Sequence, residues 1–246
     1  VGGTLNATGT EANPITFTAL NDDSVGGDTD GVVDPPEAGD GGTFIWARGG
    51  STTTIAQAEM RYGGVAIDGD GADGGLLAIA DSTIADSGSP FPGEPLSIRG
   101  DDCCGSSPLE LRVTDSDISG RIDVSDVEPI LKRNVARHSW RVHNSPDLSQ
   151  IPLTGPDANA FVGTGPERRL QVGGTVPAGA TWDIDPASGA IVGGSGSSIY
   201  IEGSLNVFPG TVLKYPNFSV TVGGTLNATG TEANPITFTA LNDDSV

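Results

Sequence analysis

Residues 1–25 read VGGTLNATGTEANPITFTALNDDSV, and residues 222–246 repeat this stretch letter for letter. Two identical segments that begin 221 residues apart are typical of a tandem array, in which every unit makes the same contacts with its neighbours. We therefore predict one repeat unit in residues 1–221 and the start of a second, identical unit in residues 222–246.

Apolar and polar side chains alternate inside the repeated segment and just before it. Val220 and Val222, for example, are each followed by a polar or small residue, and Leu226 continues the pattern. A period of two residues is typical of β-strands that bury one face. Gly, Pro and Asn separate these short runs, as in Asn234-Pro235, where the backbone must turn. The segment therefore predicts short strands joined by tight turns.

A shorter spacing lies within the last third of the chain. Residues 201–207 (IEGSLNV) align with residues 222–228 (VGGTLNA) at a spacing of 21, and residues 172–176 (VGGTV) have the same shape. Residues 127–138 fit either a short helix or a strand with a loop, because Pro129 disfavours a helix interior. Further strands are predicted over residues 43–47, 53–61, 76–80, 109–113 and 121–124. The pattern predicts an all-β solenoid.

Four runs resemble a known family: residues 1–31, 153–165 (LTGPDANAFVGTG), 176–186 (VPAGATWDIDP) and 203–217 (GSLNVFPGTVLKYPN). They are similar to the right-handed parallel β-helix repeats of microbial cell-surface and secreted proteins in the pectin-lyase-like superfamily. The resemblance implies three-sided coils, stacked parallel sheets, a non-catalytic repeat and an extracellular location. With coils about 4.8 Å apart, a 221-residue unit of roughly ten coils would advance about 50 Å along the axis.

The chain is strongly acidic, with 32 Asp and Glu residues against 12 Lys and Arg residues and a formal net charge of −20. Lys132 and Lys214 are its only lysines. Such a surface is a poor partner for nucleic acid and for anionic membranes. No stretch approaches the ~20 apolar residues that a membrane-spanning helix needs.

Two glycine-rich acidic loops are candidate calcium sites. Calcium prefers several hard oxygen ligands on a flexible loop, and both loops contain the Asp-x-Asp-Gly spacing. Neither loop has the closing Glu of an EF-hand, so a solvated acidic turn is the competing interpretation. Calcium is the one cofactor that we predict. The candidate metal ligands are Asp22, Asp23, Asp28, Asp30 and Asp34 in the first loop and Asp68, Asp70 and Asp73 in the second.

Cys103 and Cys104 are adjacent in the chain. Extracellular proteins rarely keep free thiols, so the pair indicates either a vicinal disulfide or two bridges to neighbouring chains; we expect the vicinal disulfide. Asn6, Asn217 and Asn227 lie in glycosylation sequons. For Asn6 and Asn227 we favour a different role, a ladder of side-chain amides along the coils.

The function that we expect is structural: the subunit of an extracellular filament or surface fibre, stacked head to tail with other copies of itself. Lateral bundling of such rods remains open. One alternative is a surface adhesin or glycan-binding stalk with the same fold. The other is a polysaccharide lyase or hydrolase, which would need a basic residue beside a calcium cluster or a pair of spaced carboxylates. The only histidines, His138 and His143, are surrounded by no catalytic motif. We therefore expect no enzymatic activity.

Overall fold

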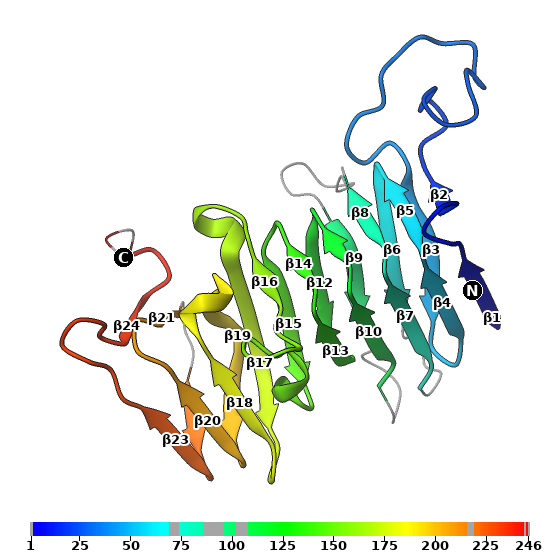
Figure 1. Cartoon of the computed structure of the whole chain (residues 1–246). Helices are drawn as coiled ribbons and strands as arrows, with labels where there is room; N and C mark the ends of the chain where they lie inside the picture. The colour runs from blue at the N-terminus through cyan, green and yellow to red at the C-terminus, as the bar shows by residue number, and fades with distance from the viewer. Residues whose placement is uncertain are drawn as a thin grey trace.

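The computed structural model describes residues 2–68, 74–85, 96–101, 108–215, 219–243 and 245. Among these residues, strands make up nearly all regular structure, and every strand of a sheet runs parallel to its neighbours. Figure 1 shows them stacked along one long axis, with the two copies of the repeated segment at opposite ends. None of the described helices has the length and hydropathy needed to cross a membrane. The fold is a parallel β-helix.

Four sheets form its walls. Sheet I contains β1 (Thr4–Thr8), β4 (Thr52–Ala56), β7 (Leu76–Ala80), β10 (Glu110–Thr114) and β13 (Glu128–Lys132). Sheet II contains β2 (Ile15–Phe17), β5 (Ala58–Arg61), β8 (Thr83–Ala85), β11 (Asp117–Ile118), β14 (Val135–Ala136) and β16 (Ala160–Phe161). Sheet III contains β3 (Gly42–Arg48), β6 (Gly63–Asp68), β9 (Leu96–Asp101), β12 (Arg121–Ser125), β15 (Trp140–Ser145), β17 (Arg169–Val176), β19 (Ile191–Ile201), β21 (Val212–Tyr215) and β24 (Thr237–Ala240), with β22 (Val220–Val222) also paired to β19. Sheet IV contains β18 (Thr181–Ile184), β20 (Ser204–Val207) and β23 (Thr225–Ala228).

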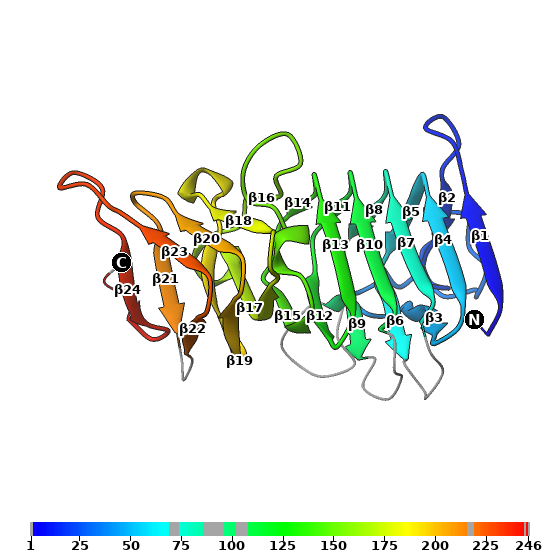
Figure 2. The same cartoon turned by 90° about the horizontal axis from the view of Figure 1, so that it is seen from below.

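The chain winds around the axis, visiting the walls in turn. On one side of the β-helix, successive coils begin with the strands of sheet I, then with the 3₁₀ helix η1 (Leu148–Gln150), and then with β18 and β20 of sheet IV, before β23 of the second copy. Figure 2 shows these strands in order along the axis. Two other 3₁₀ turns, η2 (Gly165–Arg168) and η3 (Pro186–Ser188), occupy corners. The described residues thus give eight coils per unit, slightly fewer than the roughly ten expected. At about 4.8 Å per coil, one unit advances about 38 Å.

Buried apolar columns run along the axis inside the walls. In sheet I, Ala7, Ile55, Ile79, Val113 and Leu131 lie in register, and all are less than 9% exposed. Each strand points every second side chain inward, so parallel stacking in register places one apolar residue directly above the next. These columns exclude water from the whole length of the β-helix.

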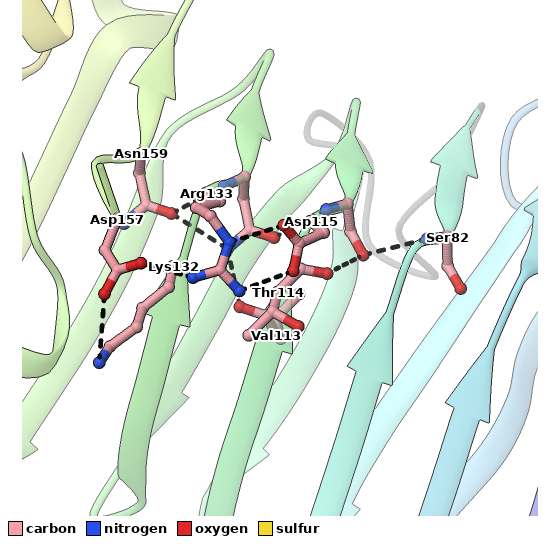
Figure 3. A network of polar contacts seen from close by, with 10 residues as sticks. Ser82, Val113, Thr114, Asp115, Lys132, Arg133, Asp157 and Asn159 are labelled. Carbon is pink, nitrogen blue, oxygen red and sulfur yellow. Dashed lines mark hydrogen bonds and ion pairs between the residues drawn. The ribbon is translucent and has the colours of Figure 1, made fainter. Parts of the chain in front are cut away.

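A polar column runs along the corner between sheets I and II (Figure 3). Ser82, Ser116, Asn134 and Asn159 are each 3% exposed or less. The Ser116 hydroxyl accepts the backbone N–H of Ser82 at 3.2 Å. In the same way, the Asn134 side chain accepts the N–H of Ser116, and the Asn159 side chain accepts the N–H of Asn134, both at 3.1 Å. Asn134 also donates to the Val113 carbonyl at 2.8 Å. The corner therefore has hydrogen-bond partners for its buried amides, which would otherwise destabilise the turn.

The residue that directly follows the sheet I strand adopts a left-handed backbone conformation in four successive coils. Gln57, Asp81, Asp115 and Arg133 have φ values of 50°, 47°, 55° and 57°. The left-handed residue reverses the chain direction at the corner, which lets a strand of sheet II follow one of sheet I after only one or two residues. On the exposed side, Arg133 joins Asp115 at 2.7 Å and Asp157 at 2.5 Å, so it bridges three coils.

The strands expected at residues 43–47, 76–80, 109–113 and 121–124 are confirmed as β3, β7, β10 and β12. The strand expected at 53–61 is two strands, because the left-handed Gln57 divides it. For residues 127–138 the strand alternative is correct. Pro129 lies in β13 at the edge of sheet I, where its missing N–H interrupts no strand pair.

The spacing of 21 is confirmed where Leu226 lies beside Leu205. The similarity of residues 172–176 to these coils is misleading. Val176 pairs with Ile201, while Trp182 occupies the column of Leu205. A turn of different length between β17 and β18 shifts the register.

We expect Asn134→Ala to lower the free energy of unfolding by about 2–4 kcal/mol, because it leaves the buried Ser116 N–H without its acceptor and removes the side-chain donor to the Val113 carbonyl. Asn134→Ser should cost less, since serine fills the same position of the column at residues 82 and 116. Urea unfolding of both variants measures the difference. Equal losses would mean that packing, rather than hydrogen bonding, stabilises this corner.

Candidate functional site

The two copies of the repeated segment adopt the same local structure. In the first copy, Asp22 closes a turn by accepting hydrogen bonds from the Thr18 hydroxyl and from the N–H and hydroxyl of Ser24. The second copy repeats all three bonds around Asp243. The turn is therefore encoded by the segment itself and forms at both ends of the β-helix.

The two copies use opposite edges. In the first copy, β1 and β2 pair with β4 and β5, which follow them in the chain. In the second copy, β23 and β24 pair with β20 and β21, which precede them. Thus Leu5 lies beside Thr53, whereas its copy Leu226 lies beside Leu205. The segment has two pairing edges, and each is filled in one of its copies.

Different amides serve the two edges. Ile15 donates its N–H to the Gln57 carbonyl of the following coil at 3.1 Å. Thr237, the copy of Thr16, donates to the Thr211 carbonyl of the preceding coil at 3.0 Å. Neighbouring amides of a strand point to opposite sides, so one strand can pair with both partners at once.

Three predicted metal ligands come together in the first acidic loop. One carboxylate oxygen from each of Asp23, Asp28 and Asp30 lies within 4.8 Å of the other two. Desolvation and the charges of the other two carboxylates raise the pKa of Asp23. A set of hard oxygens that repel one another in this way suits a divalent cation such as Ca²⁺.

The other described ligand candidates lie in different surroundings. Asp22 is buried, and the hydrogen bonds from Ser24 and Thr18 lower its pKa. Asp34 lines a shallow pocket together with Asp23. Asp68 lies on β6, with its Oδ2 3.8 Å from Nε of Arg48. Asp70, Asp73, Cys103, Cys104 and Asn217 lie outside the described residues, so the predictions for them stay as they are.

The predicted amide ladder forms in the second copy. Asn227 donates to Oδ1 of Asn206 at 2.8 Å, and Asn206 donates to Oδ1 of Asp183 at 2.7 Å. In the first copy, the exposed Asn6 lies in register with Thr54 of the following coil. The ladder therefore crosses from the body of the unit into the repeated segment.

A basic face on sheet III escapes sequence reasoning, because it depends on the register between strands that are far apart in the chain. Asp123 lies between Arg99 and Arg141 in one row of this sheet. Arg99 also stands over Trp46, with 5.5 Å from Cζ to the ring centre. Five of the 12 Lys and Arg residues lie at exposed or half-buried positions on the strands of this sheet: Arg48, Arg99, Arg121, Arg141 and Arg169.

The two histidines add no positive charge to this face near neutral pH. Burial lowers the pKa of His138 and that of His143. His138 accepts the N–H of Ser139 at 2.9 Å, which holds its ring against its own backbone.

Comparisons with models of protein families, with curated proteins and with solved structures gave no significant match.

We expect Ca²⁺ to raise the melting temperature and EDTA to lower it, because a bound cation relieves the repulsion among Asp23, Asp28 and Asp30. The double variant Asp28→Asn with Asp30→Asn should lose this response. Glu11→Gln, which removes one charge from an exposed position outside this loop, should retain it. A melting temperature that is indifferent to Ca²⁺ in the unaltered protein would contradict the prediction.

Proposed function

We propose that this chain is a structural subunit of an extracellular filament or surface fibre, in which identical units stack end to end along the β-helix axis. The observation that carries the proposal is the pairing of the repeated segment. The same residues pair with a preceding coil in one copy and with a following coil in the other. In an array, one segment would do both.

Such an array would have continuous walls. If β23 also served as β1 of the next unit, β4 would follow it, and Leu205, Leu226 and the equivalent of Thr53 would form one column. Sheet IV would then continue into sheet I. By the same reasoning, β24 would serve as β2, so that sheet III would continue into sheet II.

The outer face of the second copy supports this continuation. Leu226 and Phe238 are 37% and 55% exposed. Their counterparts Leu5 and Phe17, covered by the next coil, are only partly exposed and pack against the core. Covering the second copy with another coil would bury this apolar surface and pair its open edge, both of which favour stacking.

The extracellular location, the absence of catalysis and the pectin-lyase-like relationship belong to the same proposal. They rest on the four runs that resemble repeats of secreted proteins, and the parallel coils are compatible with such a relationship. The charge of −20 also suits a surface filament, because like charges keep neighbouring rods apart.

Chains of one, two and four units should form rods whose length grows by about 38 Å per added unit, as measured by electron microscopy. Thr237→Pro at an internal junction removes the N–H that reaches Thr211 and should bend the rod there. Thr237→Ala keeps that N–H and should leave the rod straight. Beads on flexible connections, in place of rods, would refute the proposal.

The basic face favours a second candidate, a surface stalk that binds an acidic glycan. The five arginines of this face outnumber the three acids on the described strands of sheet III, Asp68, Asp101 and Asp123, although the chain as a whole is acidic. Arg99 and Arg141 lie in one row parallel to the axis, with Asp123 between them, and Arg121 and Arg169 lie in a neighbouring row. A linear polyanion could lie along such a row.

Replacing Arg99 and Arg141 by Gln should weaken binding of polygalacturonate at least tenfold at low salt. The matched control replaces Arg112 and Arg133, which lie outside sheet III, by Gln. Surface plasmon resonance at several salt concentrations compares the two pairs. Equal weakening by both pairs would indicate a nonspecific charge effect, and no binding by the unaltered protein would exclude this candidate.

A further inference from the structure

Lys214 lies directly below the second copy of the repeated segment. It is on β21, it is 7% exposed, and its backbone is in register with Thr239 of β24. Its Nζ donates to the backbone carbonyl of Asp243, the residue that closes the turn of the second copy. A buried ammonium group needs such an acceptor, because it has lost its water. The turn of the second copy therefore provides the acceptor for Lys214.

Arg61 contacts the same turn from the other side in the first copy. Its Nη1 donates to the Ser24 hydroxyl at 3.4 Å, while its Nε contacts Glu59 at 2.7 Å. Arg61 follows Met60, which is in register with Phe17, so Arg61 lies one coil above Thr18. Arg61 and Lys214 thus approach equivalent turns from the following and the preceding coil.

The two cations contact different atoms of the turn. Lys214 binds a backbone carbonyl, and Arg61 binds a serine hydroxyl. Each also lowers the pKa of the turn aspartate that it faces, although the hydrogen bonds from serine and threonine are the larger cause. Because the two contacts do not compete, one turn can accept both.

We propose that the turn of residues 18–24 is the coupling element between successive units, held by Lys214 of the preceding unit and by Arg61 of its own unit. The partner that Lys214 would hold is the turn of another copy of this same segment. The inference rests on the proposed stacking of units and adds the residues that recognise the incoming unit. In so acidic a chain, two cations placed around one acidic turn also favour that turn over the other acidic turns.

The test is Lys214→Met in the full chain, read by hydrogen exchange and mass spectrometry. A Glu232→Asp background gives peptides that span residues 232–243 a different mass from the corresponding peptides of the first copy. We expect the amides of residues 237–243 to exchange at least tenfold faster, while those of residues 16–22 stay unchanged. Lys132→Met, which removes the other lysine, 3.9 Å from Asp157, should change neither copy.

Unchanged exchange in the second copy, or equal acceleration in both copies, would overturn the proposal that Lys214 holds the turn. In arrays, Lys214→Met should add bends at the junctions between units, and straight rods would overturn the coupling role. Arrays that form no rods even with Lys214 present would refute the proposed function. The exchange result in the single chain would still decide whether Lys214 holds the turn.

Discussion

The structure depends on parallel backbone pairing between each coil and the next. A strand in this β-helix finds partners for its N–H and C=O groups only in the coils before and after it, so order propagates along one dimension. This constraint fixes the register, and the register in turn sets the side-chain columns. Ile55 lies beside Ile79 because their backbones pair, and each added coil lengthens the apolar column by one residue.

Corners are the positions where this constraint is hardest to satisfy. A strand that leaves sheet I must turn sharply while its amides remain buried. The left-handed residues Asp115 and Arg133 supply the change of direction, and Ser116 and Asn134, which follow them, supply the acceptors. Because the acceptor of each amide belongs to the next coil, the corners are also stabilised along the axis. Corners and walls are therefore both stabilised by hydrogen bonds between successive coils.

Strands could be predicted from the sequence wherever the alternation of side chains is local, as in residues 76–80. The spacing of 21 could be predicted because residues 201–207 and 222–228 have similar sequences, and β20 and β23 within them pair without a shift of register. Elsewhere the register between neighbouring strands could not be predicted from the sequence. The corner residues Ser82, Ser116 and Asn134 follow one another at unequal intervals, since loops of different length leave the other corners. For the same reason no local pattern in the sequence predicts the basic face of sheet III or the position of Lys214 beneath Asp243.

Electrostatics must also agree with stacking, because coils about 4.8 Å apart bring the charges of successive turns close together. The chain has few cations, and several of them pair with a carboxylate of a neighbouring coil. Arg133 bridges Asp115 and Asp157, and Asp123 lies within ion-pair distance of Arg121 and Arg141. At these positions opposite charges lie next to each other along the axis, where the separation is shortest. Exposed carboxylates elsewhere, such as Glu128, are screened by water and salt. A strongly acidic chain can therefore stack closely along one direction while it still repels its neighbours in the other two.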